Sequence, residues 1–270
     1  MSTFLPLTIF VLTVDATTIS TPTSSANNVS IFNVSAYGGD FSGDTIECGS
    51  METCHIVCNE ESGCEYMTIN ASMVANLVLG CGAQSACYGF NLQSPGPTNL
   101  SMTCNGTQSC RDGLIEMADT DQIDIYCDSN LTTDNTDTYS CRYLAVNAMN
   151  TKSFQMDCVA GCGDTDFQFQ NVDSFYMRCA EESCAYGTVN ISNAESVDIG
   201  CYTADDTLCL ESAEFHFGNA GDIALDGISR FAFKWSHVYL YGDSGSFSMN
   251  CLSKTGCYGA EIYATNYESR

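Results

Sequence analysis

Apolar residues alternate with small or polar residues in the stretch that precedes a recurring cysteine. Alternation with a period of two predicts a β-strand that buries one face. Two positions before these cysteines lie Ile56, Leu79, Met102, Ile125, Met156, Met177, Ile199 and Met249. Four positions before them lie Leu77, Leu100, Ile123, Phe154, Phe175, Val197 and Phe247.

A second apolar alternation follows each partner cysteine, and it predicts a second strand with an inward face. Polar stretches such as residues 94–99 (SPGPTN) separate the two strands, and their Pro and Gly close a turn. Five positions after the partner cysteines lie Ile69, Leu92, Ile115, Val146, Phe167, Val189 and Ile262. Seven positions after them lie Ala71, Met117, Ala148, Phe169 and Ile191, with Ser94 as the exception.

The step from the second cysteine of one pair to the first cysteine of the next is constant, as in Cys64 to Cys81 and Cys184 to Cys201. The stretch inside a pair varies in length. A fixed segment that alternates with a variable one, at a period of about 23 residues, indicates a stacked repeat. Two inward-facing strands per repeat, without an apolar stripe at helical spacing, predict an all-β fold. The predicted architecture is a right-handed parallel β-helix, a solenoid of about ten coils with a disulfide-stapled loop on most coils.

One coil of the predicted repeat lacks both cysteines. Gly227 stands where a first cysteine is expected, and counting back from Cys251 by the constant step places Lys234 at the second cysteine position. The residues that this count turns inward are Ile223, Leu225, Tyr239 and Tyr241.

The 18 cysteines make nine pairs that are close in sequence. Bridges could join cysteines stacked in adjacent coils, or they could close the variable loop within one coil. Pairing within a coil is favoured, because the coil with Gly227 and Lys234 has lost both members together. Metal binding is not favoured, since the three histidines are scattered singly. The predicted loop-closing pairs are Cys58–Cys64, Cys81–Cys87, Cys104–Cys110, Cys127–Cys141, Cys158–Cys162, Cys179–Cys184, Cys201–Cys209 and Cys251–Cys257. Cys48 and Cys54 fall on strand positions, so the pair Cys48–Cys54 is predicted as a separate bridge near the N-terminal cap.

The N-terminal residues have the composition of a secretory signal peptide. Residues 1–16 contain the apolar run FLPLTIFVLTV and a small-residue cleavage site at Val14–Ala16. Residues 17–30 form a Ser/Thr-rich linker, which leaves residues 31–270 as a single β-helix domain. The sequence stops part-way through a coil, so we expect a domain truncated at its C-terminus. The cysteine content indicates an oxidising compartment and predicts a secreted or cell-surface protein.

Seven Asn-x-Ser/Thr sequons predict a glycoprotein. Asn70 and Asn190 occupy the same repeat position, one residue after an inward residue, so both should face outward. The predicted N-glycosylation sites are Asn28, Asn33, Asn70, Asn99, Asn105, Asn130 and Asn190.

The formal net charge of −25 argues against nucleic acid and anionic membranes as partners, because both need basic surfaces. No segment after the signal peptide is apolar enough to insert into a membrane. Ca²⁺ is the one cofactor that the acidic residues bring into consideration. A solvated acidic face is favoured over a calcium site, because the ligand spacing of a calcium loop is missing. The acidic candidates are Asp119/Asp121, Asp164/Asp166, Asp205/Asp206 and residues 128–137.

The predicted architecture resembles that of the pectin-lyase-like superfamily, whose enzymes cut acidic polysaccharides. The side-by-side Asp205 and Asp206 offer two carboxylates for glycoside hydrolysis, but the His-Gly and Arg-x-Lys motifs of polygalacturonases are missing. The arginines fall singly in different coils, which departs from the arginine base of pectate lyases. No catalytic residue is therefore predicted.

The cysteine segments CNEESGC (58–64), CGAQSAC (81–87) and CNGTQSC (104–110), each followed by an apolar strand, resemble a second group. They are similar to the cysteine-rich repeat proteins that protists and related single-celled eukaryotes secrete. The resemblance covers about residues 35–270. It implies the β-helix architecture and says little about function.

The coil without cysteines reads GISRFAFKWSH and holds the only tryptophan. Its aromatic residues could stack on sugar rings while its basic residues donate hydrogen bonds. Alternatively, the aromatic residues pack the loop that a disulfide would otherwise hold. The candidate glycan-binding residues are Arg230, Phe231, Phe233, Lys234 and Trp235.

Every coil repeats the same stabilising residues and no coil gathers a reactive constellation. The sequence therefore predicts a secreted or cell-surface structural or adhesive module without catalytic activity. The alternative is a carbohydrate-binding or polysaccharide-cleaving β-helix protein. The expected partners are extracellular glycans or other surface proteins, with end-to-end self-association as a third option.

Overall fold

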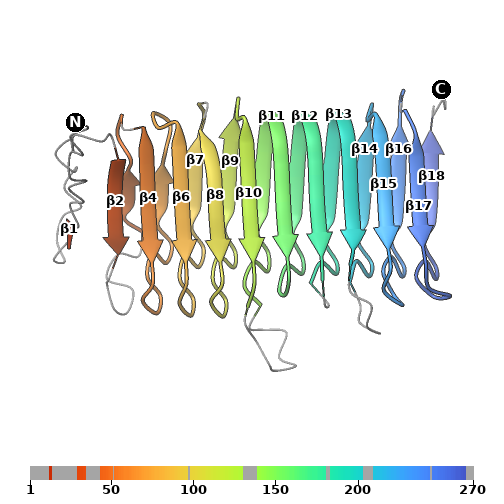
Figure 1. Cartoon of the computed structure of the whole chain (residues 1–270), viewed down its shortest axis with the longest axis horizontal. Coiled ribbons are helices and arrows are strands. Elements are labelled where there is room, and N and C mark those ends of the chain that lie inside the picture. The colour runs from red at the N-terminus through yellow and green to blue at the C-terminus, as the bar shows by residue number, and fades with distance from the viewer. Residues whose placement is uncertain are drawn as a thin grey trace, which may run out of the picture.

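The computed structural model describes residues 43–265 except 51, 97, 130–138, 181–182, 203–208 and 244, and the backbone of strands β1 (Leu12–Thr13) and β2 (Val29–Val34). The described chain is all-β, with parallel strands stacked into a solenoid of about nine turns (Figure 1). This is the parallel β-helix that the sequence predicts. The rest of the predicted signal peptide and linker lies outside the described residues.

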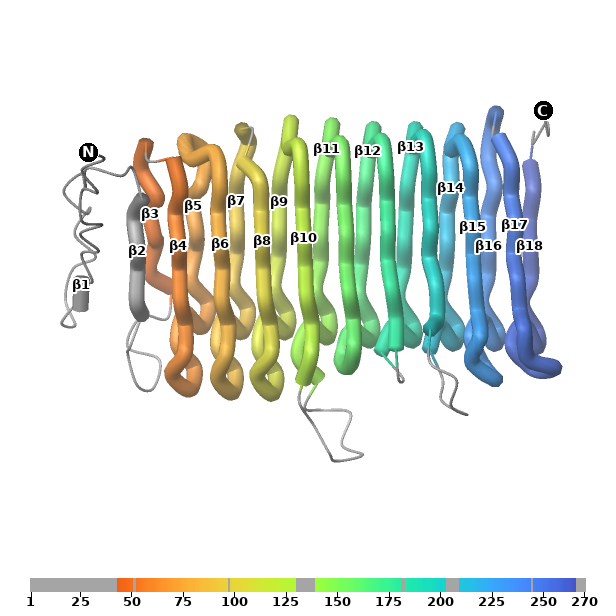
Figure 2. Tube along the Cα trace, viewed as in Figure 1, coloured from red at the N-terminus to blue at the C-terminus, as the bar shows by residue number. Residues whose placement is uncertain are grey.

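Each coil contributes a strand to a front face and a strand to a back face, and Figure 2 shows the path of the chain between the two. Three continuous strands cover both faces in one bend: β11 (Ala145–Cys158), β12 (Asp166–Cys179) and β13 (Thr188–Cys201). The other front strands are β2, β4 (Thr53–Cys58), β6 (Asn76–Cys81), β8 (Asn99–Cys104), β10 (Gln122–Cys127), β15 (Asp222–Gly227) and β17 (Phe247–Cys251). The other back strands are β3 (Thr45–Glu47), β5 (Thr68–Asn70), β7 (Asn91–Ser94), β9 (Leu114–Ala118), β14 (Glu214–Gly218), β16 (His237–Tyr241) and β18 (Glu261–Thr265).

Equivalent positions of successive coils pair in register. The inward residues therefore stack on one another and form one continuous core. Phe154 stacks on Phe175 of the next coil with ring centroids 4.7 Å apart, and Phe169 packs against Phe154 at 4.6 Å. The first-cysteine column runs through Cys58, Cys81, Cys104, Cys127, Cys158, Cys179, Cys201, Gly227 and Cys251.

Eight disulfides staple the loops at the lower edge of Figure 1, each within one coil. The ninth, Cys48–Cys54, spans the turn from β3 into β4 at the upper edge, near the N-terminal end of the solenoid. The nine bridges have Cα–Cα distances of 5.7–6.3 Å, which suit a disulfide. They join the same cysteines as the pairs inferred from the sequence. So many bridges fit an oxidising extracellular environment.

The coil without cysteines differs from the sequence prediction by one residue. Phe233, and not Lys234, takes the second cysteine position: its N–H donates to Gly256 O, next to Cys257 of the following coil. The ring of Phe233 is fully buried and fills the space beside Gly227. The prediction that Tyr239 and Tyr241 point inward is therefore wrong. The inward residues of β16 are Val238 and Leu240.

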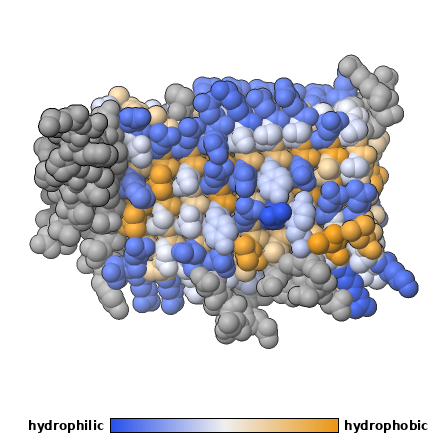
Figure 3. Space-filling model, in the orientation of Figure 1, coloured by the Kyte–Doolittle hydropathy of each residue, from blue (hydrophilic) through white to orange (hydrophobic). Residues whose placement is uncertain are grey.

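An asparagine ladder runs along the upper edge, where the back face bends into the front face. Figure 3 shows hydrophilic residues gathered along this edge. Each side-chain amide of the ladder donates to the carbonyl or carboxylate oxygen of the coil before it, at 2.8–3.2 Å. All members have a positive φ, which Asn and Asp tolerate better than most residues. The ladder consists of Asp119, Asn150, Asn171, Asn193 and Asn219.

Asn171→Ala is expected to lower the free energy of unfolding by about 2 kcal/mol, because it removes two side-chain hydrogen bonds and strains a left-handed residue. Asn171→Gly loses the same hydrogen bonds but accepts the positive φ, so about half of that loss is expected. Denaturant unfolding with the disulfides intact measures both. Wild-type stability in the alanine variant would contradict the role given to the ladder.

Candidate functional site

A column of residues with a left-handed backbone conformation (positive φ) lies at the edge where each lower loop continues into a back strand. We call it the left-handed edge. The backbone N–H of each member donates to the carbonyl that precedes the next member, one coil on. The column therefore stays in register although the loops differ in length. Its members, all with φ between 53° and 72°, are Tyr66, Gly89, Asp112, Tyr143, Asp164, Tyr186, Ser212, Trp235 and Gly259.

Trp235 lies flat on the left-handed edge and covers Gly259 of the next coil. A Cβ added to Gly259 would collide with the indole, so the ring covers the outer surface of this glycine. Tyr258 stands beside it, with ring centroids 5.2 Å apart and an interplanar angle of 82°. The indole is 47% exposed. Together the three residues form a floor and a perpendicular wall, which we call the Trp235 corner.

The same arrangement recurs near the other end of the solenoid. Tyr66 lies over Gly89, where an added Cβ would collide with its ring, and Tyr88 stands perpendicular to it. The centroids of the two tyrosine rings are 5.4 Å apart at an angle of 84°. Tyr66 is 49% exposed. This Tyr66 corner occupies the same three repeat positions as the Trp235 corner.

Each corner can hold one flat ring of a ligand. The floor ring offers an apolar face, and the wall ring adds a polar hydroxyl, the combination through which tyrosine and tryptophan act at binding surfaces. A pyranose has C–H groups on one face and hydroxyls around its edge. The corner geometry therefore suits the stacking of a sugar ring.

The structure places the five glycan-binding candidates inferred from the sequence in different environments, and not all of them can reach a ligand. Trp235 is on the surface, but Phe233 belongs to the core and cannot contact a ligand. Lys234 forms an ion pair with Glu211 at 2.8 Å, and its Nζ lies 5.3 Å from the centroid of the Phe231 ring. The guanidinium of Arg230 lies 5.3 Å from the same ring. The two basic residues thus pack against Phe231.

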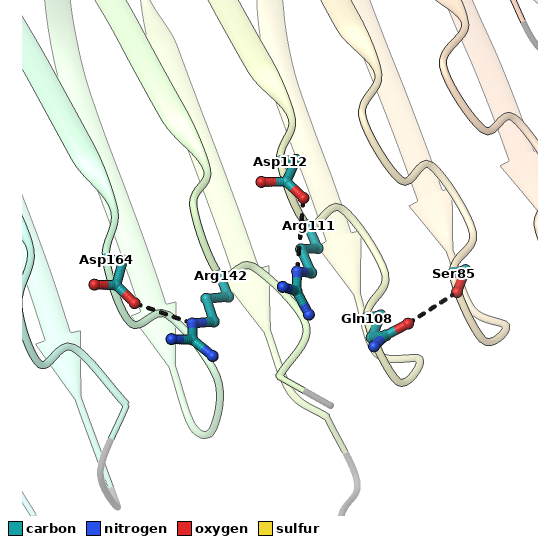
Figure 4. A network of polar contacts seen from close by, with 6 residues as sticks. All are labelled: Ser85, Gln108, Arg111, Asp112, Arg142 and Asp164. Atoms are coloured by element: carbon teal, nitrogen blue, oxygen red, sulfur yellow. Dashed lines mark hydrogen bonds and ion pairs between the residues drawn. The ribbon is translucent and has the colours of Figure 1, made fainter. Parts of the chain in front are cut away.

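Charged and polar side chains occupy the edge between the two corners. Figure 4 shows that Arg111 and Arg142 lie on neighbouring coils, close to Asp112 and Asp164 respectively. The Nε of Arg142 donates to Asp164 at 3.0 Å. Both guanidinium groups also approach the ring of Tyr143, at 5.4 and 4.8 Å from its centroid. The ring of Tyr143 is thus engaged by arginine, unlike the floor rings of the two corners.

The acidic pairs considered for Ca²⁺ are engaged with donors where the structure describes them. Asp119 accepts from Asn150 at 2.8 Å, and Asp121 pairs with Lys152 at 2.5 Å. Asp166 accepts from Gln168 at 2.7 Å. Asp205, Asp206 and most of residues 128–137 lie outside the described residues. Within the described ranges, the groups of three or more metal-ligand candidates consist of cysteines already joined in disulfides.

Two carboxylates meet on the front face in a cluster that the sequence did not indicate. The ring of Tyr202 folds back over Gly200, and the guanidinium of Arg178 lies 4.6 Å from its centroid. Burial, followed by the charge of Asp226, raises the pKa of Asp198. Burial and the charge of Asp198 raise the pKa of Tyr202 to about 12. A carboxyl with a raised pKa beside a second carboxylate is the pairing that acid–base catalysis uses, so this cluster is where cleavage chemistry would be tested.

The predicted glycosylation sites are spread over several parts of the repeat. Asn70 and Asn190 stand on back strands in one outward column, and Asn99 stands on a front strand. Asn105 is exposed in a stapled loop. Asn28 and Asn130 lie outside the described residues, and only the backbone of Asn33 is described, in β2.

Comparisons with known protein families, with curated proteins and with solved structures found no match for this chain. Among the described residues there is no helix long and apolar enough to cross a membrane.

Sequence reasoning found the floor of one corner but missed both walls and the whole Tyr66 corner. The available signal was positional: Tyr66 and Trp235 are followed one coil later by a Tyr-Gly pair, Tyr88–Gly89 and Tyr258–Gly259. Reading that signal requires the exact register of neighbouring coils.

Asp112→Asn is expected to lower the pKa of Tyr88. A hydrogen bond to the Asp112 carboxylate, helped by burial and its charge, raises that pKa to about 12. The raised pKa contributes stability at pH values below about 10, the ordinary tyrosine pKa, and this contribution is lost as the pH rises to about 12. Near-ultraviolet titration of wild type, Asp112→Asn and Tyr88→Phe measures the shift.

Asp164→Asn is the matched control, because Asp164 occupies the same column and contacts Arg142. An unchanged titration of Tyr88 in Asp112→Asn would contradict the hydrogen bond assigned to the wall of the Tyr66 corner.

Proposed function

We propose that this protein is a secreted or cell-surface adhesive rod without catalytic activity, and that it binds the sugar rings of extracellular glycans. The recurrence of one aromatic corner near both ends of the solenoid carries this proposal. The two corners share the same repeat positions, nearly equal ring angles and nearly equal exposure. A purely structural rod has no need of exposed aromatic floors at these positions.

The spacing of the corners supports adhesion by avidity. Seven coil steps separate Tyr66 from Trp235 along the left-handed edge. At about 4.8 Å per step, the corners are roughly 34 Å apart on one edge. The stapled coils keep this distance constant. Two weak sites on a stiff scaffold bind a repetitive surface far more tightly than either site alone.

The charge of the protein narrows the class of glycan. A net charge of −25 repels acidic polysaccharides, and Lys234 at the Trp235 corner is already neutralised by Glu211. The corner residues themselves carry no formal charge. We therefore assign the corners to uncharged sugars.

On a surface coated densely with an uncharged glycan, Trp235→Ala or Tyr66→Ala is expected to lower the apparent affinity by about 100-fold, because each change removes one of two linked sites. The double variant should not bind detectably. Surface plasmon resonance against a panel of immobilised glycans measures these affinities. Light scattering of the unliganded protein separates sugar binding from self-association.

Tyr186→Ala is the matched control, because Tyr186 is an exposed tyrosine of the same column but has Ser212 and not glycine on the next coil. Its affinity should equal that of wild type. Failure of the wild type to bind any glycan would favour the purely structural role. Release of free sugar from the panel, lost in Asp198→Asn, would favour the polysaccharide-cleaving alternative.

A further inference from the structure

A groove of about 840 Å³ runs along the back face, over the strands from β7 to β16. Its volume falls in the range of ordinary small-molecule sites. Outward side chains of one register column line it, namely Gln93, Glu116, Asn147, Gln168, Asn190 and His216. The groove thus carries a row of polar side chains on a lining that is otherwise mostly apolar, and it lies at the opposite end of β16 from the Trp235 corner.

One lining residue is itself a glycosylation sequon. Asn190, Ile191 and Ser192 form the sequence Asn-Ile-Ser, and all three residues line the groove. Among the described residues, no hydrogen-bond partner holds the amide of Asn190. Its Nδ2 is therefore available for substitution without loss of an existing bond.

Open space and an aromatic wall lie beyond Asn190. Gly218 stands in register between Ser192 and Tyr241, and a Cβ added there would meet no atom closer than 3.9 Å. The hydroxyl of Tyr241 is within 3.2 Å of His216 Nδ1, which fixes the ring at this end of the groove. Two coil steps, about 10 Å, separate the column positions of Ser192 and Tyr241. A sugar on Asn190 can cross Gly218 and reach the Tyr241 ring over that distance.

We propose that Asn190 carries an N-linked glycan whose first sugars lie in this groove against Tyr241. In the transfer, Asn190 Nδ2 forms a bond to the anomeric carbon of an oligosaccharide held on a lipid pyrophosphate. The bond from that carbon to the pyrophosphate oxygen breaks, the lipid pyrophosphate leaves, and Nδ2 gives up one proton. Transfer takes place on the unfolded chain, so the groove closes around the attached sugars as β13 and β14 pair.

The attached glycan keeps free ligands out of the groove, because its tether gives it a higher local concentration there than a free ligand reaches. A covalently tethered sugar has an effective concentration in the millimolar range, which weakly bound free sugars do not match. The back face is therefore a surface that the protein covers with its own carbohydrate. The two aromatic corners stay open on the other edge.

Asn70 provides an internal control. It is a sequon in the same outward column, five coils before Asn190, but it does not line the groove. Both asparagines are partly exposed on back strands. A difference between the two glycans therefore reports on the groove and not on the strand.

The test uses the full chain secreted from a eukaryotic host. Glycopeptide mass spectrometry measures the glycan occupancy of each site and the rate at which the glycan is released. We expect glycan at both Asn190 and Asn70. In the folded protein, an endoglycosidase should release the glycan about tenfold more slowly at Asn190 than at Asn70, because one aromatic contact stabilises the bound sugar by about that factor. After reduction and unfolding, the two rates should be equal. Tyr241→Ala and Gly218→Leu, which remove the wall and fill the space, should each raise the rate at Asn190 to that at Asn70.

An unoccupied Asn190, or equal release rates at the two sites in the folded wild type, would overturn the proposal. Unchanged slow release in both variants would also overturn it. If a variant is not secreted, the comparison of Asn190 with Asn70 before and after unfolding decides by itself. Loss of binding in Trp235→Ala leaves these rates unaffected, so this test and that of the adhesive function fail independently.

Discussion

In-register stacking of equivalent positions is the constraint on which the rest of this structure depends. A single coil of this repeat cannot bury its own apolar face, so each inward residue is covered by the same position of the coils on either side. Phe154 on Phe175 and the asparagine ladder through Asn171 are two products of this rule. A favourable contact made once is made again about every 4.8 Å along the axis. The disulfides add to this order by closing each loop at its base, so that loops of unequal length return to a common register.

The same constraint explains why the left-handed edge is the place where the molecule can vary. Backbone hydrogen bonds from coil to coil hold this column, and they do not depend on side-chain identity. Glycine, aspartate, tyrosine and tryptophan all occupy it. An aromatic residue here has one face on the next coil and the other toward solvent whenever the next position is glycine, as at Gly89 and Gly259. Surface chemistry can therefore change without disturbing the core.

Periodic alternation and the cysteine step were sufficient to predict the fold and the two strands of most coils. The prediction failed where it relied on a count alone, at Lys234, because the segment from Phe233 to Cys251 is one residue longer than the constant step from Cys64 to Cys81. A buried phenylalanine, Phe233, had taken the place of a cysteine, and nothing in the local sequence separates it from its neighbour Phe231. The Trp235 corner was half predicted for a related reason. Its wall and base, Tyr258 and Gly259, come from the next coil, and their contact depends on a register that one sequence does not show directly.

Concave surfaces on a stacked rod require a break in the repetition, and in this protein glycine supplies the break. Where every position is covered by its own kind, side chains of equal length leave a smooth wall. A glycine within such a column leaves a space one side chain deep. Buried rings fill some of these spaces from inside the core, as Phe233 does beside Gly227, and an outer ring lies at four others. Tyr66 covers Gly89, Tyr202 covers Gly200, Trp235 covers Gly259, and Tyr241 follows Gly218. At three of them the ring fills the space and becomes a floor or a packed cluster. Gly218 alone of the four keeps its space open, since an added Cβ meets no atom closer than 3.9 Å. That difference separates a surface that presents aromatic rings to an external sugar from a groove that can hold one.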